Sequence, residues 1–437
     1  MFLKNPGMKD DAHKNRTQGG DNTMRKWVEP WYFTYALLGM TMAGIAPIML
    51  PLAVSHSGNV VAVGMVMAAF NLGGLAAPLW GDFADRYRLH RWLMFGGLLT
   101  TALALAAFPF TTSLPIWLIL ALMQGVGAAA VATIANLFIV EVHPQAEWDA
   151  RIGWLQTYYG AGQVGGLLLA GALSQVGLSL GLLTAAVLTA LGVAPGWFVR
   201  TPTNPVSSRP LLPQPALHAH WAAGSPQHFY HRPTLKALQQ MMRSLNSPFV
   251  IFLALWFISF AGAAAFFSLY PVLMQHLYGV GSEVSSIGFA IAAAVGLVLY
   301  APSGRWAERL GALRVLQMGL GLRGFAFLGL AVLGISHFQS QAALALLGFL
   351  FVVLAWSLLS VSGTALAAQL APSGEGNGIG IFNASSALAG VLGAAGGGWL
   401  AQQWGYDAVT IFGVIGIIVG LTVSGVISKT KGGKKVP

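Results

Sequence analysis

The stretch from Gly81 to Arg91 reads Gly-Asp-Phe-Ala-Asp-Arg-Tyr-Arg-Leu-His-Arg and forms a polar island between two long apolar runs. It recurs from Gly304 to Arg314 as Gly-Arg-Trp-Ala-Glu-Arg-Leu-Gly-Ala-Leu-Arg, with a glycine, an alanine, an acid and two arginines in the same places. Both copies separate apolar runs of helical length. The repeat therefore indicates a chain built from two similar halves.

The composition excludes a water-soluble globular protein. Of the 437 residues, 56% are hydrophobic and only 8% are charged, whereas soluble domains carry roughly 25% charged residues. Apolar runs of about 20 residues, the length that crosses a bilayer as a helix, recur from Tyr32 to just before Lys429. The 55 glycines suit close helix packing in lipid. We therefore expect an all-α polytopic membrane protein.

The apolar runs predict twelve transmembrane helices in two pseudo-symmetric six-helix halves. The halves are expected at residues 31–199 and 248–428. The predicted spans are 31–54, 59–80, 92–111, 115–139, 152–175, 178–199, 248–275, 284–303, 315–335, 341–370, 379–402 and 406–427.

The basic residues predict the orientation in the membrane. All Lys and Arg residues except Arg323 fall in the two tails, or in loops and helix ends on one side. The positive-inside rule makes that side cytoplasmic, so both termini are expected in the cytoplasm of a cell-membrane protein. The tail 1–30, the linker 200–247 and the basic tail 429–437 would then be cytoplasmic. Because the first 30 residues have no hydrophobic segment, the first span is expected to act as its own insertion signal. After Pro233 the linker can form a short amphipathic helix on the membrane surface.

The repeated island resembles the signature loop between spans 2 and 3 of the major facilitator superfamily of secondary transporters. Gly81, Asp85 and Arg86 match that signature, but Arg88 stands where a glycine belongs and Leu89 where an arginine belongs. The second copy keeps the glycines and the arginine, with a glutamate for the aspartate. The resemblance extends over both halves and implies the fold of that family.

The resemblance also implies a gate. In the family, the aspartate that corresponds to Asp85 lies against the start of span 11 and stabilises the outward-facing state as a latch. In this chain the start of span 11 is near Gly378. A free helix amino terminus favours such a negative charge. The alternative is a solvated basic anchor without a switching role. The candidate gating residues are Gly81, Asp85, Arg86, Arg91, Gly304, Glu308, Arg309 and Arg314.

Two further stretches resemble the drug and proton antiporter branch. In span 5, Gly160 to Gly166 is similar to its glycine motif, with Gln163 in place of the proline. In span 4, Gln124 to Ala128 is similar to the motif there, but Ala121 replaces the expected arginine. The alternative for these glycines is tight helix packing.

The ionisable residues leave the coupling ion open. None of the thirteen acids lies at mid-membrane in the predicted spans, so a proton carrier would be a boundary residue such as Asp85 or Glu141, or the chain is a uniporter. Arg323 is the single charge inside a span. It either contacts substrate, or has a structural role or reaches a lipid headgroup by snorkelling from a peripheral helix.

In the family, substrate binds a central cavity between the halves. The candidates at mid-depth are neutral, aromatic or amide side chains, which suit an uncharged or lipophilic compound better than an anion. We expect its efflux by alternating access, with facilitated uptake, lipid translocation or a non-transporting receptor as alternatives. No Gly-rich ATP loop is present, so gradients are expected to supply the energy. An enzyme activity, a cofactor, a metal and a nucleic-acid partner are not expected, and the chain is expected to be a monomer. The candidate substrate residues are Tyr35, Asn71, Gln124, Tyr159, Gln163, Trp256, Phe260 and Trp356.

Overall fold

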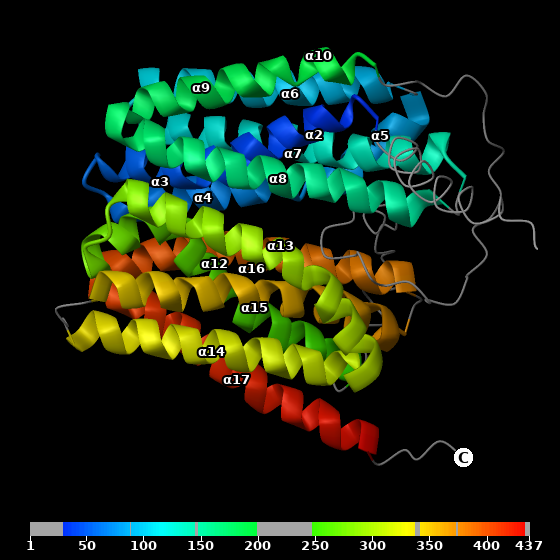
Figure 1. Cartoon of the computed structure of the whole chain (residues 1–437), viewed down its shortest axis with the longest axis vertical. Coiled ribbons are helices and arrows are strands. Elements are labelled where there is room, and N and C mark those ends of the chain that lie inside the picture. The colour runs from blue at the N-terminus through cyan, green and yellow to red at the C-terminus, as the bar shows by residue number, and fades with distance from the viewer. Residues whose placement is uncertain are drawn as a thin grey trace, which may run out of the picture.

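The computed structural model describes residues 29–87, 89–144, 147–198, 247–336, 341–372 and 375–432. Nearly all of them are helical, and Figure 1 shows the helices as two bundles stacked one on the other. The expected amphipathic helix after Pro233 and both expected tails, except for their innermost residues, lie outside the described residues. The two bundles are the two halves that the repeat predicted.

The amino-terminal half runs from α2 to α10. Its first membrane helix has three parts, because a π-helical turn, η2, interrupts it. The bounds are α2 Tyr32–Gly39, η2 Met40–Ile45, α3 Ala46–Ser55, α4 Val60–Gly74, α5 Ala77–Tyr87, α6 His90–Ala107, η3 Phe108–Phe110, α7 Leu114–Val142, α8 Trp148–Val176, α9 Leu178–Leu191 and α10 Val193–Gly196.

The carboxy-terminal half runs from α12 to α17. An aromatic cluster fills its core, where the ring centroids of Tyr270 and Phe349 lie 4.0 Å apart and those of Phe266 and Phe327 lie 5.2 Å apart. The bounds are α12 Pro248–Tyr278, α13 Ser282–Leu310, α14 Ala312–Ser336, α15 Gln341–Leu370, α16 Glu375–Trp404 and α17 Tyr406–Gly432.

The predicted spans correspond to these helices. Eleven helices of the described ranges are long and apolar enough to cross a membrane, and α8 has the length but carries polar residues such as Gln156 and Gln163. The predicted turn at Gly81 to Arg91 is shorter than expected. Helix α5 continues to Tyr87 and α6 starts at His90, so most of the polar island is helical.

Local sequence signals set the helix ends. The side chain of Asn59 accepts a hydrogen bond from the backbone of Ala62 at the start of α4, and Ser247 caps α12 in the same way. Proline follows Ser247 at the first helical position, where no backbone donor is needed. At Gly279 (φ 67°) and Gly405 (φ 84°) the chain takes the left-handed conformation, which lets short turns join long helices.

The glycines of α8 pack against the first membrane helix. A Cβ on Gly162 would collide with the carbonyl oxygen of Ala36, and one on Gly166 with that of Met40. A Cβ on Gly44 would in turn lie 2.6 Å from the Cα of Gly166. This is the tight packing that the sequence left as the alternative for the Gly160 to Gly166 stretch.

The two halves contact each other through α4 with α16 and α8 with α13. We call the ends near Phe198 and Ser247 the linker side, and the opposite ends the far side. The contacts are tightest at the far side. There a Cβ on Gly398 would lie 2.9 Å from the Cα of Gly64, and one on Gly171 would lie 3.2 Å from the carbonyl oxygen of Glu283. Closer to the linker side a cavity separates the halves.

Candidate functional site: the cavity between the halves

The cavity consists of two adjoining chambers. The outer chamber, of about 900 Å³, is lined by residues toward the linker side, such as Thr133, Thr364 and Ile379. The inner chamber, of about 390 Å³, is lined by residues nearer the far side, such as Pro47 and Phe289. Volumes of this size are typical of small-molecule sites.

The carboxy-terminal half contributes an aromatic wall. Trp256 and Phe260 of α12 and Trp356 of α15 line it, with ring centroids 5.9 Å apart for Trp256 and Phe260 and 5.7 Å apart for Phe260 and Trp356. Trp256 is 3% exposed, and its indole Nε1 donates a hydrogen bond of 2.8 Å to Oγ of Ser386 on α16. That bond fixes the ring at the cavity surface.

The amino-terminal half contributes tyrosines and amides. Tyr35 and Tyr159 line the outer chamber with their ring centroids 5.0 Å apart. Asn71 and Gln163 line both chambers. The Asn71 amide Nδ2 lies 3.5 Å from the carbonyl oxygen of Gly390, so it reaches across to α16 of the other half.

The structure brings seven of the eight candidate substrate residues to this cavity. Gln124 is the exception: it is 1% exposed, and its Nε2 lies 3.6 Å from Sδ of Met42, between α7 and η2. Tyr300 of α13, which sequence reasoning did not single out, lines both chambers. The sequence feature that could have identified Tyr300 is its position one helical turn before the second polar island.

Arg323 lies in the cavity and not at the membrane surface. It is 2% exposed and lines the inner chamber, with its Cζ 5.5 Å from the ring centroid of Trp356. Its Nη2 lies 3.4 Å from the carbonyl oxygen of Val352. The alternative in which this side chain snorkels to a lipid headgroup is therefore wrong, because the side chain points into the protein.

In the first polar island, Arg91 joins helices within its own half. Gly81 is buried, and the Arg86 guanidinium lies 5.6 Å from the Tyr87 ring. Arg91 donates a hydrogen bond of 2.9 Å to the carbonyl oxygen of Trp197 and stacks on that indole at 3.9 Å. The side chain of Asp85, which carries the latch prediction, lies outside the described residues.

The second island turns at a glycine. Gly304 is buried in α13, and Gly311 takes a left-handed φ of 88° between α13 and α14. A side chain would strain that position, and Arg88 occupies the equivalent place in the first copy. Glu308, Arg309 and Arg314 are exposed around it at the linker side.

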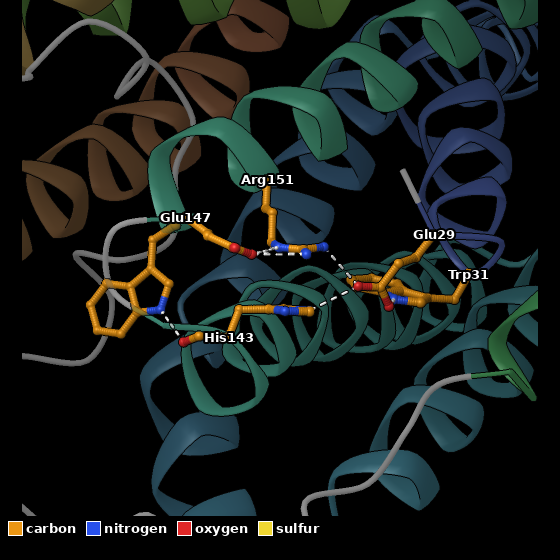
Figure 2. Close-up of polar contacts among 6 residues, drawn as sticks. Glu29, Trp31, His143, Glu147 and Arg151 are labelled. Carbon is orange, nitrogen blue, oxygen red and sulfur yellow. Dashed lines mark hydrogen bonds and ion pairs between the residues drawn. The ribbon is translucent and has the colours of Figure 1, made fainter. Parts of the chain in front are cut away.

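A second polar site ties the start of α2 to the ends of α7 and α8 (Figure 2). Oε1 of Glu29 lies 2.9 Å from Nη1 of Arg151 and 2.8 Å from Nε2 of His143. The other oxygen of Glu29 accepts a hydrogen bond of 2.8 Å from the indole of Trp31. Arg151 also pairs with Glu147 at 2.9 Å, four residues earlier on the chain. The sequence analysis did not foresee this cluster.

The cluster sets the protonation of His143. Removal from water is the largest influence and lowers the pKa of this imidazole below its usual value. Glu29 raises the pKa and Arg151 lowers it, and the net direction is downward. His143 is therefore neutral at pH 7 and donates its Nε2 proton to Glu29. Among the described residues no group of three or more His, Asp or Glu side chains has the arrangement of a metal site.

Known structures share this architecture at low sequence identity. An alanine variant of the nucleoside transporter NupG superposes with a TM-score of 0.73 at 13% identity, over 91% of this chain and 98% of that one. A POT family peptide transporter, described as auto-inhibited, gives 0.68 at 14% identity, over 93% and 97%. A bacterial homologue of the human lysosomal transporter Spinster, solved in an inward-facing and occupied conformation, gives 0.66 at 15% identity, over 92% and 96%. These likenesses show the fold.

The family assignment comes from the sequence profile. No curated protein matches the chain. The profile described as Major Facilitator Superfamily matches residues 31–378 and 302–436, nearly the whole chain. With the two-bundle fold and the central cavity, this match makes the protein a multi-pass membrane transporter and not an enzyme. The chain belongs to the Major Facilitator Superfamily.

Proposed function

We propose that this transporter exports a small lipophilic compound from the cytoplasm by alternating access. The observation that carries the proposal is the aromatic wall of the cavity, formed by Trp256, Phe260 and Trp356. Aromatic rings bind apolar ligands over a large area, and the few amide and hydroxyl groups beside them orient a ligand. The outer chamber is lined by residues toward the linker side, such as Thr133, Thr364 and Ile379.

The basic residues support the direction of transport. Arg86, Arg151, Arg305, Arg309 and Arg314 are described at the linker side, and the rule for basic residues makes this side cytoplasmic, with both termini. The halves are closed against each other at the far side. A cavity that fills from the cytoplasm favours export over uptake.

Rocking of the two halves would exchange the closed and open sides. In this scheme the glycine contacts of the far side separate while the two polar islands approach the opposite half. Asp85 and Arg86 of one island, with Glu308 and Arg309 of the other, are the residues that we propose as the cytoplasmic gate.

A coupling proton would bind near a membrane boundary. The described carboxylates Glu29, Glu147, Glu283, Glu308 and Asp407 all lie at or just beyond helix ends. None of these lies at the depth of the cavity, where proton carriers of transporters are usually found. We infer that proton coupling, where it operates, acts on the gate rather than on the substrate site.

Transport into everted vesicles tests the proposal. Three fluorescent probes of different charge are compared: neutral Nile red, anionic anilinonaphthalene sulfonate and cationic ethidium, each with and without an imposed pH gradient. We expect inward accumulation of at least one probe, which corresponds to export from a cell. Trp256→Ala should reduce the initial rate about tenfold because it removes the central ring of the wall. The matched control is Trp399→Ala, since Trp399 is 49% exposed on the outside of α16.

Three results would contradict or redirect the proposal. If no probe accumulates above vesicles without the protein, export of lipophilic compounds is wrong. Equal rates in both directions, indifferent to any gradient, would indicate facilitated diffusion. If the Trp256 and Trp399 variants lose the same fraction of the initial transport rate at equal protein levels, the aromatic wall does not bind the transported compound.

A further inference from the structure

We infer that Arg323 binds an anionic group of the transported compound, so that the cargo is a lipophilic anion such as an aromatic carboxylate or sulfonate. The inference rests on the proposed function and specifies the substrate class of the same cavity. It keeps the lipophilic body of the sequence-based expectation, which was an uncharged or lipophilic cargo, and adds an anionic group to it.

The depth of Arg323 makes it costly without a ligand. It lies near the middle of the 25 residues of α14, so at about 1.5 Å per residue both helix ends are roughly 15–20 Å away along the axis. The side chain cannot reach an interface over that distance. A charged side chain at mid-membrane costs several kcal/mol unless it is paired or solvated, and such residues usually mark a substrate pathway.

The protein leaves the hydrogen-bonding capacity of Arg323 largely unused. A guanidinium has five N–H donors in a planar fork that fits a carboxylate, sulfonate or phosphate. Here Nη2 has one long contact of 3.4 Å with the carbonyl oxygen of Val352, and Nε is buried without a partner. No carboxylate within the described part of the chain forms an ion pair with it. The charge is therefore available to a ligand.

The neighbours of Arg323 hold the guanidinium at the chamber. The Trp356 ring lies against it at 5.5 Å, and Tyr300 is close enough to interact with it electrostatically. The hydroxyl of Ser357 does not compete, because it donates to the carbonyl oxygen of Gly296 at 2.9 Å. Arginine stacked on an aromatic ring loses little freedom when it binds an anion.

The rest of the chamber fits an apolar body. Phe260, Phe267, Phe289 and several alanines line the inner chamber of about 390 Å³ beside Arg323. One anionic group on an aromatic or aliphatic body would satisfy both surfaces. A lipophilic cation would place its charge against the unpaired guanidinium, so cations are rejected by repulsion.

Binding to the purified full-length protein in nanodiscs tests the inference. We expect anilinonaphthalene sulfonate to bind with increased fluorescence and to compete with Nile red, whereas ethidium does not compete. Arg323→Gln should weaken the anion at least tenfold, because it removes a charge-assisted hydrogen bond, and should change Nile red binding less than about twofold. Arg323→Lys keeps the charge but loses the planar fork of donors. Its affinity for the anion should lie between those of the unaltered protein and Arg323→Gln. Arg305→Gln removes an exposed arginine of α13 and is the matched control.

The outcomes separate the inference from the proposed function. Nile red transport without anion binding, or anion binding unchanged in Arg323→Gln, would overturn the inference and leave lipophilic export in place. Absence of transport for every probe would instead contradict the export proposal, while the Arg323 binding series would still decide the anion site. If inorganic phosphate competes with Nile red as well as anilinonaphthalene sulfonate does, the site binds free anions. The claim that the ligand has a lipophilic body would then be wrong. Where the Arg323 variants do not fold, the ratio of anion to cation binding in the unaltered protein decides, and equal binding of both overturns the inference.

Discussion

The two halves touch backbone to backbone at the far side of the cavity, but a chamber of about 900 Å³ separates them toward the linker side. The far-side contact depends on residues without side chains, such as Gly64 and Gly398. The linker side carries exposed charges and the two polar islands. The far side is therefore closed by close backbone packing. The linker side instead carries charged side chains that can attract one another. The two ends of the cavity therefore differ in the interactions that are available to close them.

The largest effect is expected from a methyl group at the closed end. Gly398→Ala would place a Cβ 2.9 Å from the Cα of Gly64 and 3.0 Å from the carbonyl oxygen of Val60. Overpacking of this kind costs about 1–3 kcal/mol, which shifts the equilibrium away from the closed far side by roughly 5- to 150-fold. Because the chain has no cysteine, a single Ser268→Cys in the inner chamber reports access to an impermeant maleimide. Labelling from the far side should rise strongly.

Gly396→Ala is the matched control for that substitution. A Cβ on Gly396 meets no atom within 4 Å, although it lies on the same helix only two residues away. Labelling in this variant should equal that of the parent. A rise of equal size in both variants would show that helix propensity, and not the far-side contact, controls the equilibrium.

A smaller effect in the opposite direction is expected at the linker side. Asp85→Asn removes the negative charge that we propose as the latch of the outward-facing state. A charge at a helix terminus contributes about 0.3–1 kcal/mol, so labelling of Ser268→Cys from the far side should fall roughly two- to fivefold, with slower transport. Glu283→Gln, at an exposed carboxylate of the far side, is the control. Unchanged labelling and rate in Asp85→Asn would reduce the polar island to an anchor.

Arg91 should affect stability without affecting the equilibrium between the two states. Its hydrogen bond to Trp197 and its stacking on that ring join α6 to the end of α10 within one half. Arg91→Gln should remove about 1 kcal/mol of stability and lower the melting temperature by a few degrees in a thermal shift measurement. Maleimide access should stay unchanged. A change in maleimide labelling would instead indicate that Arg91 takes part in the gate.

The smallest effect is expected from the cluster around Glu29. The pKa of His143 is lowered in the folded protein, so the unfolded chain binds a proton more readily. The stability contributed by neutral His143 is present above about pH 6.5, the ordinary histidine value, and falls as the pH drops through that value. His143→Gln should flatten the decrease in melting temperature between pH 7.5 and pH 5.5. An equally steep decrease in the variant would place the acid sensitivity in other groups.

The fold could be predicted almost completely from the sequence, because lipid imposes one dominant rule on it. Apolar runs of membrane length must be helices, and repeated polar islands must lie where helices leave the bilayer. The same logic made the predicted loop at Gly81 to Arg91 too long. A polar stretch near the membrane boundary can remain helical, and α5 does so up to Tyr87.

The lining of the cavity was harder to predict than the fold. Trp256, Phe260 and Asn71 were found because depth along a helix is readable from the sequence. Gln124 was misplaced since depth says nothing about which face of α7 the side chain occupies. For Arg323 the sequence left substrate contact, a structural role and a lipid headgroup open, and only the packing of α14 against α15 shows that its side chain lies beside Trp356.

The π-helical turn Met40–Ile45 gives the first membrane helix one residue more than a continuous α-helix would need. Its bond from the backbone N–H of Ala46 to the carbonyl oxygen of Thr41 spans five residues instead of four. Deleting one residue from this turn would restore an unbroken α-helix and rotate α3 by about 100° relative to α2. Pro47, which lines the inner chamber, would then turn away from it. The shape of the chamber beside Arg323 thus depends on a single inserted residue, because that residue sets the rotation of α3 relative to α2.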